Sequence, residues 1–298
     1  MAKVRELRRR IKSVENTRQI TRTMEMVATS RLKRAQDRVV AARPYATALT
    51  EVISNLYSPE YTEQFPLLRQ PGDERARVAV VLLTSNRGLC GGFNGNLIRE
   101  ARSRLAELEK TGADVELHAI GRKGIQYFKY VGREMATARE DIGDRPTAAH
   151  AVEVITPLME RFEQGDLDAV EVIFAKFRSA ISTPPTLLPV LPIQPPAEDP
   201  GKDEHAESSG RIPNFILSPT AEEIIGAILP LYVQNAMYRA LVETAASEHG
   251  ARRTAMKNAT DNAGEMIDTL RRTYNRARQG QITQELAEIV GGAEALKG

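Results

Sequence analysis

The amino-acid sequence predicts an α/β protein in which a central, largely parallel α/β domain is joined to a long antiparallel coiled coil of the N- and C-terminal helices. A seven-residue repeat of apolar or small residues runs through both ends of the chain, over residues 3–43 and 256–277, as in helices that pair along a seam. Between these ends, short apolar runs alternate with segments of helical spacing, which is typical of parallel sheets. The 298 residues are enough for about two ordinary domains.

Residues 3–43 are expected to form one uninterrupted helix, because this stretch contains neither proline nor glycine. At roughly 1.5 Å per residue the helix is about 60 Å long, so most of it must lie outside a small domain. Arg18 and Glu25 interrupt the apolar repeat, which costs stability but fixes the register of pairing or suits a different partner. We assign residues 1–60 to this N-terminal coiled-coil helix. Its repeat positions are Val4, Leu7, Ile11, Val14, Thr21, Ala28, Leu32, Ala35, Val39 and Ala42.

Residues 76–193 are predicted to form the α/β domain. A Val-rich strand from residue 76 ends in a polar, Gly-rich turn at 85–95. The elements expected after it are helix 94–110, strand 114–121, helix 121–132, helix 148–165 and strand 169–177. Right-handed crossovers would place these helices on the faces of the sheet. Residues 183–193 contain four prolines, so they are expected to form an edge or terminal strand.

The last third of the chain is predicted to be a linker and a second long helix. Residues 194–211 are acidic, Pro-rich and almost free of large apolar side chains, which indicates a loop or disordered linker. A short strand is a candidate at 214–220, and Thr220 with Glu223 forms a plausible capping box for the helix. We assign residues 212–298 to the C-terminal coiled-coil helix.

This second helix is expected to run to about Val290 and to pair with the first, leaving the C-terminal tip alone because it is the longer of the two. Pairing is antiparallel if both helices leave the same side of the α/β domain. Pro230, Gly250 and Gly280 are places where it is expected to bend or fray. Its predicted seam consists of Met256, Ala259, Ala263, Met266, Leu270, Thr273 and Ala277, with Val242 and Ala245 extending it backwards.

Charge is segregated along the chain although the net charge is only +2. Residues 1–43 hold thirteen Lys or Arg against four acids, a net charge of +9, and residues 134–171 hold ten acids against three Arg, a net charge of −7. Cys90 is the only cysteine, so an intrachain disulfide or a Cys-rich zinc site is excluded. No apolar run reaches 18 residues, and the N-terminus resembles neither a signal nor a transit peptide, so a mature bacterial-type product without membrane insertion is expected.

The loop 85–95 is the strongest candidate for an active site, since ligands often bind after the first strand of an α/β sheet. It matches neither GxxxxGK[ST] nor GxGxxG, so a tight, close-packed turn is the favoured interpretation. Cys90 would be a nucleophile only beside His118 or His150, and a buried small thiol is favoured instead. The histidines show no metal-binding spacing, and acids such as Asp141, Asp144, Asp166 and Asp168 are expected to be solvated. No catalytic, cofactor or metal residue is predicted.

The basic N-terminal helix is a candidate nucleic-acid-binding or membrane-binding element. It has no aromatic residue before Tyr45 to stack on bases, and the chain has no Trp to anchor it in a membrane surface. An acidic protein partner is therefore favoured. A nucleotide-binding α/β enzyme with coiled-coil arms and a basic nucleic-acid-binding coiled coil remain as alternatives.

Three segments, residues 20–36, 85–97 and 258–296, resemble the gamma subunits of F-type ATP synthases of bacterial type in sequence, order and spacing. The most specific is the pattern ITxExxEI followed by two small residues. It is met by Ile282, Thr283, Glu285, Glu288, Ile289, Gly291 and Gly292. Residues 194–211 are not part of the shared pattern, a plant-type redox insert is missing, and Gly280 stands where the family usually has alanine.

The resemblance implies a non-catalytic rotor shaft inside a hexamer of alpha and beta subunits, with catalysis in the beta subunits. It also implies an α/β foot that meets the epsilon subunit and the membrane c-ring, on the cytoplasmic face of the bacterial plasma membrane. No cofactor and no nucleic-acid partner are implied. The basic helix, with Arg8, Arg9 and Arg10, suits acidic lever loops of beta. The residues expected to contact the hexamer are Met24, Arg252, Arg278, Gln279, Thr283 and Glu285.

Overall fold

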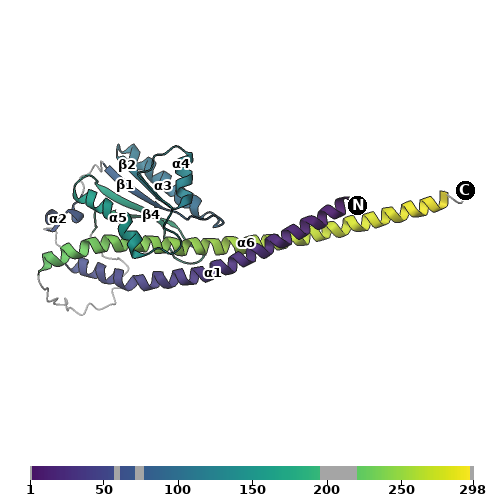
Figure 1. Ribbon diagram of the computed structural model, residues 1–298, viewed down its shortest axis with the longest axis horizontal. Helices are drawn as coiled ribbons and strands as arrows, with labels where there is room; N and C mark the ends of the chain where they lie inside the picture. The colour runs from purple at the N-terminus through teal and green to yellow at the C-terminus, as the bar shows by residue number, and fades with distance from the viewer. Residues whose placement is uncertain (1, 57–60, 71–76, 195–219, 296–298) are drawn as a thin grey trace, which may run out of the picture. The chain divides into compact units, whose positions relative to one another are not determined.

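The computed structural model describes the chain except for residues 1, 57–60, 71–76, 195–219 and 296–298 (Figure 1). The elements are α1 (Ala2–Leu56), α2 (Tyr61–Gln64), the 3-10 turn η1 (Pro66–Leu68), β1 (Arg77–Leu83), α3 (Phe93–Lys110), β2 (Asp114–Ile120), α4 (Arg122–Tyr130), β3 (Thr137–Arg139), α5 (Ala148–Glu163), β4 (Ala169–Ala175), β5 (Pro185–Leu191) and α6 (Ala221–Ala295). The contacts between residues divide the chain into two units, and each unit contains part of α1 and part of α6. Residues 31–251 form the α/β unit, and residues 1–30 with 252–298 form the coiled-coil unit.

The α/β unit is built on a five-stranded sheet in the order β3–β2–β1–β4–β5. Strands β3, β2, β1 and β4 are parallel, and β5 is antiparallel to β4 at the edge. This confirms the predicted, largely parallel sheet with a Pro-rich edge strand. Strand β3 was not predicted, because three residues are too few to show a period.

Helices cover both faces of the sheet. Successive side chains of β1 point to opposite faces. Val80 and Leu82 belong to a core with residues of α3 and α4, whereas Val81 and Leu83 belong to a core with residues of α5 and α6. Every residue of β1 after Arg77 is buried, which explains why its sequence is a continuous apolar run.

Within the α/β unit, α6 is buried along one stretch, residues 241–250. Leu241 packs into the core that α5 and α6 share with the sheet, while Ala246 packs with Ala35 of α1. Small side chains at the helix contact let the two backbones approach closely. Residues 241–250 of α6 are therefore part of the buried core of the α/β unit.

In the coiled-coil unit, α1 and α6 run antiparallel. Thr260 Oγ1 lies 2.8 Å from Thr21 Oγ1, and Arg271 Nη2 donates to Glu15 Oε1 at 2.6 Å. Because the residue number falls along α1 as it rises along α6, the predicted antiparallel pairing is confirmed. The predicted seam of α1 is also confirmed, since each of its positions is buried or half-buried.

The seam of α6 lies on a different flank from the one predicted. Met266 is 54% exposed, whereas its neighbour Ile267 is 2% exposed. Thr273 is likewise exposed, and Tyr274 is half-buried. The predicted seam and the observed seam share Met256, Ala263, Leu270 and Ala277, and both have a seven-residue period. Periodicity in the sequence therefore does not decide which flank of α6 faces α1. The flank that α1 covers carries Thr260, Ile267 and Tyr274.

Helix α1 continues beyond Arg43, where its proline-free stretch ends, and contains Pro44. Proline removes one helical hydrogen bond and favours a break. Beyond it, Ala46, Leu49 and Ile53 are buried, and this apolar packing stabilises a continuous helix. Helix α6 likewise runs without interruption through Pro230, Gly250 and Gly280.

The predicted linker 194–211 and the candidate strand 214–220 lie outside the described residues except at Gln194 and Thr220. Thr220 Oγ1 accepts a hydrogen bond from the Glu223 backbone N–H at 3.2 Å. This confirms Thr220 as the side-chain cap at the start of α6.

Candidate functional site

The Gly-rich loop 85–95 folds as the expected tight turn. Ser85 Oγ donates to Arg87 O at 2.6 Å, Asn94 Nδ2 donates to Ser85 Oγ at 2.8 Å, and Ser85 N–H donates to Asn94 Oδ1 at 3.0 Å. Cys90 is 3% exposed and packs in the core shared with α3. The polar groups of this loop thus hold its own shape, and its thiol is buried as expected.

Helix α6 occupies the place where an α/β sheet commonly binds a ligand. That place lies outside the carboxyl ends of the parallel strands. Here a cavity of about 20 Å³ is lined by Leu83 to Asn86 and Ile120, and by Leu241, Thr244, Ala245 and Glu248 of α6. Small-molecule sites span several hundred Å³. The cavity therefore has no room for a nucleotide, which disfavours the alternative of a nucleotide-binding enzyme.

The two histidines considered as partners of Cys90 have structural roles. His118 Nδ1 lies 3.1 Å from Thr137 Oγ1, and its Nε2 lies 3.5 Å from Glu116 Oε2. Burial lowers the pKa of His118, and the nearby Glu116 carboxylate opposes this only in part. His150 belongs to the capping box of α5: its Nδ1 accepts the Thr147 backbone N–H at 3.3 Å, and Thr147 Oγ1 accepts the His150 backbone N–H at 3.4 Å. Neither role is that of a general base.

Across the part of the chain that the structure describes, no group of three or more His, Cys, Asp or Glu side chains is placed to hold a metal ion. Over the same residues, no helix has the length and apolar character needed to cross a membrane.

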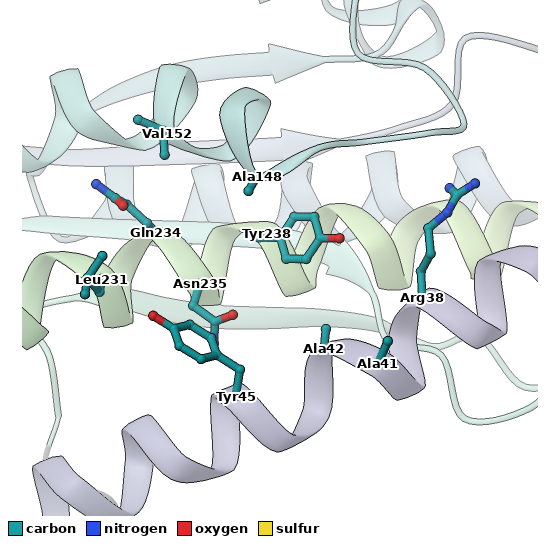
Figure 2. A pocket seen from close by; sticks show the side chains of 10 residues that line it. All are labelled: Arg38, Ala41, Ala42, Tyr45, Ala148, Val152, Leu231, Gln234, Asn235 and Tyr238. Atoms are coloured by element: carbon teal, nitrogen blue, oxygen red, sulfur yellow. The ribbon is translucent and has the colours of Figure 1, made fainter.

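A groove of about 430 Å³ lies on the surface of the α/β unit between α1, α5 and α6 (Figure 2). Val152, Leu231 and Tyr45 are exposed on its walls, and Arg38 lies at one end. Its remaining lining residues are Ala41, Ala42, Ala148, Gln234, Asn235 and Tyr238. None of them is Asp, Glu, His, Lys or Cys, so the groove has ligand-like dimensions but lacks the carboxyl, imidazole, amine and thiol groups of most catalytic sites.

Asp144 joins both long helices to the loop before α5. Its Oδ2 lies 2.5 Å from Nη1 of Arg31 in α1 and 3.5 Å from Nε2 of His249 in α6. We expected Asp144 to be a solvated acid, and this prediction was wrong. The prediction failed for Asp168 too, since its Oδ2 accepts the Arg77 backbone N–H at 2.8 Å. Spacing along the sequence contains no signal for such long-range pairs.

The C-terminal end of α6 has an unpaired apolar face. Ile282, Leu286, Ile289 and Val290 are between 48% and 68% exposed. Their spacing of four, three and one residues places them on one side of the helix. Residues 282–293 are all exposed, which confirms that the tip of the longer helix extends beyond its pairing partner.

Most of the predicted contact residues are accessible. Arg278, Gln279, Thr283 and Glu285 are exposed on the same tip. Arg8, Arg9 and Arg10 are exposed on α1, where Arg10 Nη2 pairs with Glu6 Oε1 at 2.6 Å, and Met24 is half-buried. Arg252 is 8% exposed, so it presents little surface to another subunit.

Gly280 weakens the tip locally, and Gly280→Ala should strengthen it. The residue is helical, its φ is not positive, and a Cβ there would meet nothing within 4 Å. Alanine should therefore stabilise the helix by about 0.5–1 kcal/mol through reduced freedom of the unfolded chain. In the free chain, amide exchange of residues 278–290 should slow by roughly twofold to fivefold. Residues 256–277 should be unchanged, and faster or equal exchange at the tip would contradict a helical Gly280.

Comparison with known proteins gives concordant matches over the entire chain. The sequence model of the ATP synthase family matches residues 3–296. The chain is 60% identical to the ATP synthase gamma chain of Gemmatimonas aurantiaca, with all of both chains covered. It is 45% identical to that of Leptospira biflexa, over 99% of this chain and 100% of the relative.

Solved structures match the fold. A chain of the rotor of Euglena gracilis mitochondrial ATP synthase has a TM-score of 0.62 at 18% identity, covering 94% of this chain and 99% of that one. A chain of the central stalk and c-ring of the Tetrahymena thermophila mitochondrial ATP synthase has a TM-score of 0.60 at 23% identity, covering 80% and 99%.

Proposed function

This chain belongs to the ATP synthase gamma chain family and is the non-catalytic rotor shaft of an F-type ATP synthase, and we propose that its C-terminal tip turns inside the hexamer of alpha and beta subunits. The observation that supports this placement is the unpaired apolar face at Ile282, Leu286, Ile289 and Val290. At about 1.5 Å per residue, residues 282–295 form a helix roughly 20 Å long. Apolar surface of this extent is stabilised when a partner covers it.

The flanking polar residues complete the proposed contact. Arg278, Gln279, Thr283 and Glu285 are exposed beside the apolar face. Exposed polar groups at the rim of an apolar contact set orientation and partner choice more than affinity. One side of the tip is apolar and the other side is polar, so a fixed point around the tip faces apolar and polar side chains in turn as the tip rotates. Each catalytic subunit therefore meets a different face in turn, and its conformation is biased by that difference in contact energy.

The basic part of α1 is proposed to face acidic lever loops of the beta subunits. Residues 1–43 have a net charge of +9, and Arg8, Arg9 and Arg10 are exposed. Charge complementarity of this kind raises the rate of association and rejects wrong partners. Met24 is half-buried, and Met26, on another side of α1, is exposed, so this segment offers apolar contacts as well as charges. Arg252, which is largely buried, is the weakest candidate of the set.

The α/β unit is proposed to be the foot of the shaft, which meets the epsilon subunit and the membrane c-ring on the cytoplasmic face of the bacterial plasma membrane. Torque applied to such a foot must reach both long helices. The buried stretch of α6 at residues 241–250 and the contacts of Asp144 with Arg31 and His249 support a stiff connection within this unit. Dense packing of this kind transmits strain.

Charging the tip tests the proposal. In the double variant Leu286→Glu/Ile289→Glu, two carboxylates would have to enter an apolar sleeve, at a cost of several kcal/mol. We expect at least a tenfold fall in the amount of chain that co-purifies with the hexamer, and a comparable loss of ATP-driven proton pumping in membrane vesicles. Because both side chains are exposed in the free chain, its circular dichroism and melting temperature should hardly change.

Ile181→Glu is the matched control. Ile181 is 86% exposed and lies in the α/β unit between β4 and β5, far along the chain from the tip. This variant adds a carboxylate to an exposed apolar position without touching the proposed sleeve contact. It should assemble and pump as the unmodified chain does. Normal assembly and pumping by the tip variant would remove the tip from the hexamer contact.

A further inference from the structure

The hydroxyl of Thr244 in α6 differs from those of eight other threonines in the two long helices. Eight threonines of α1 and α6 donate their hydroxyl to the carbonyl one turn earlier; they are Thr17, Thr23, Thr29, Thr50, Thr260, Thr269, Thr273 and Thr283. Thr244 is 6% exposed, and its Oγ1 has no hydrogen-bond partner among the described residues. A buried hydroxyl without a partner is costly. The unpartnered Thr244 hydroxyl therefore indicates that a bound molecule hydrogen-bonds to it.

Thr244 lines the cavity of about 20 Å³ between α6 and the carboxyl end of β1. A cavity of at least about 10–15 Å³ by this measure holds one water molecule, provided that two to four polar groups surround it. Glu248, one helical turn after Thr244, lines the same cavity and is 7% exposed. Ser85 and Asn86 line it from the other side. The side chains of Ser85 and Asn86 already hydrogen-bond to the protein. The size of the cavity matches one water, and Thr244 and Glu248 are the two lining residues of α6 with polar side chains to bind it.

We propose that this cavity binds a single water molecule, which hydrogen-bonds Thr244 Oγ1 and bridges α6 to the segment at the end of β1. The walls come from α6, from Leu83 to Asn86 and from the loop containing Ile142, Gly143 and Pro146. A nearby hydroxyl is not available for this role. Thr84 Oγ1 already lies 3.1 Å from the Ile120 carbonyl and accepts the Gly124 N–H at 2.9 Å.

The proposed water bridge lies between α6 and the carboxyl end of β1. The same end of the sheet is where a ligand would bind in an α/β enzyme, and α6 covers it here. Water bridges are enthalpically nearly as good as direct hydrogen bonds. The water would thus connect the shaft helix to the sheet at the end where α/β enzymes commonly bind their ligands. It is independent of the contact proposed for the C-terminal tip.

Thr244→Val tests the site because the two states of the cavity predict opposite signs. Valine keeps the shape and β-branching of threonine but removes the hydroxyl. With a bound water, the variant loses a hydrogen bond, and the melting temperature of the full-length chain should fall by about 2–4 °C. In a dry cavity, the variant only removes an unpaired buried hydroxyl, and the melting temperature should stay equal or rise.

Thr156→Val is the matched control. Thr156 Oγ1 in α5 is also buried without a partner among the described residues, but Thr156 does not line this cavity. Its replacement should leave the melting temperature unchanged or raised. A high-resolution crystal structure of the full-length chain should show one water peak within hydrogen-bonding distance of Thr244 Oγ1, present in Thr244→Ser and absent in Thr244→Val. Absence of the peak in the unmodified chain, or a Thr244→Val melting temperature that is not lowered, would overturn the proposal.

Discussion

Replacing Arg104 with leucine should lower the unfolding free energy of the α/β unit by about 3–5 kcal/mol, because it removes one partner of a buried ion pair. Arg104 reaches from α3 to Glu171, a β4 residue that is 1% exposed. Its Nε and Nη2 lie 2.7 and 2.8 Å from the two carboxylate oxygens. This hydrogen-bonded contact raises the pKa of Arg104 despite its partial burial. The loss should appear as faster amide exchange in β4 and β1.

Two further variants separate the buried pair from its surroundings. Arg104→Leu/Glu171→Leu removes both charges and should recover most of the loss, since a buried pair can be replaced by apolar groups at little cost. Glu107→Gln removes the other carboxylate near Arg104, at 2.7 Å from its Nη1 but 66% exposed, and should cost less than about 0.5 kcal/mol. A loss below about 1 kcal/mol in Arg104→Leu, or a double variant no better than the single one, would contradict this account.

The strands and helices of the α/β unit could be predicted because burial on two faces leaves a plain signal in the sequence. Residues 78–83 form a continuous apolar run because α3 and α4 cover one side of β1 and α5 and α6 cover the other. The prolines at 184–192 likewise identify an edge strand, because they remove ladder donors. By contrast, β3 pairs only three residues with β2, and such a short ladder has no sequence period.

The long helices were predictable in kind but not in detail. Continuation of α1 through Pro44 depends on the buried side chains beyond it, which are tertiary contacts and leave little local signal. The flank of α6 that faces α1 depends on where the partner lies. Ile267 rather than Met266 is buried, although both fit a seven-residue repeat. Register in a coiled coil is set by both partners together.

The residues of the candidate site were also predictable only in part. The exposed residues Arg278, Gln279, Thr283 and Glu285 were found through a family resemblance in their local pattern, and their exposure in the structure is compatible with it. Contacts between segments far apart in the chain could not be predicted from the sequence. Asp144 was expected to be a solvated acid, yet it pairs with residues 113 and 105 positions away, Arg31 and His249. Charge alone does not distinguish such a residue from a surface acid.

Gly121→Ala should destabilise the α/β unit by more than about 3 kcal/mol, since two costs add at this position. Gly121 has φ +101° and ψ +134°, a conformation that side chains avoid at a cost of about 1–3 kcal/mol. A Cβ there would also overlap the Thr84 carbonyl, with the Thr84 hydroxyl oxygen at 2.7 Å. Relieving that overlap would displace the ends of β1 and β2, where Thr84 N–H donates to Ile120 O at 2.8 Å.

Gly112→Ala is the control that separates the two costs. Gly112 has φ +81° in the turn between α3 and β2, but a Cβ there would meet nothing within 4 Å. Its replacement should therefore cost only about 1–2 kcal/mol of conformational strain. Urea unfolding of the full-length variants, followed by circular dichroism, gives both losses on one scale. The difference between the two losses measures the cost of the close approach between Thr84, at the end of β1, and Gly121, at the start of α4. Equal losses in the two variants would show that the backbone at Gly121 moves away from Thr84 freely, and that this end of the sheet is not the rigid support that a shaft requires.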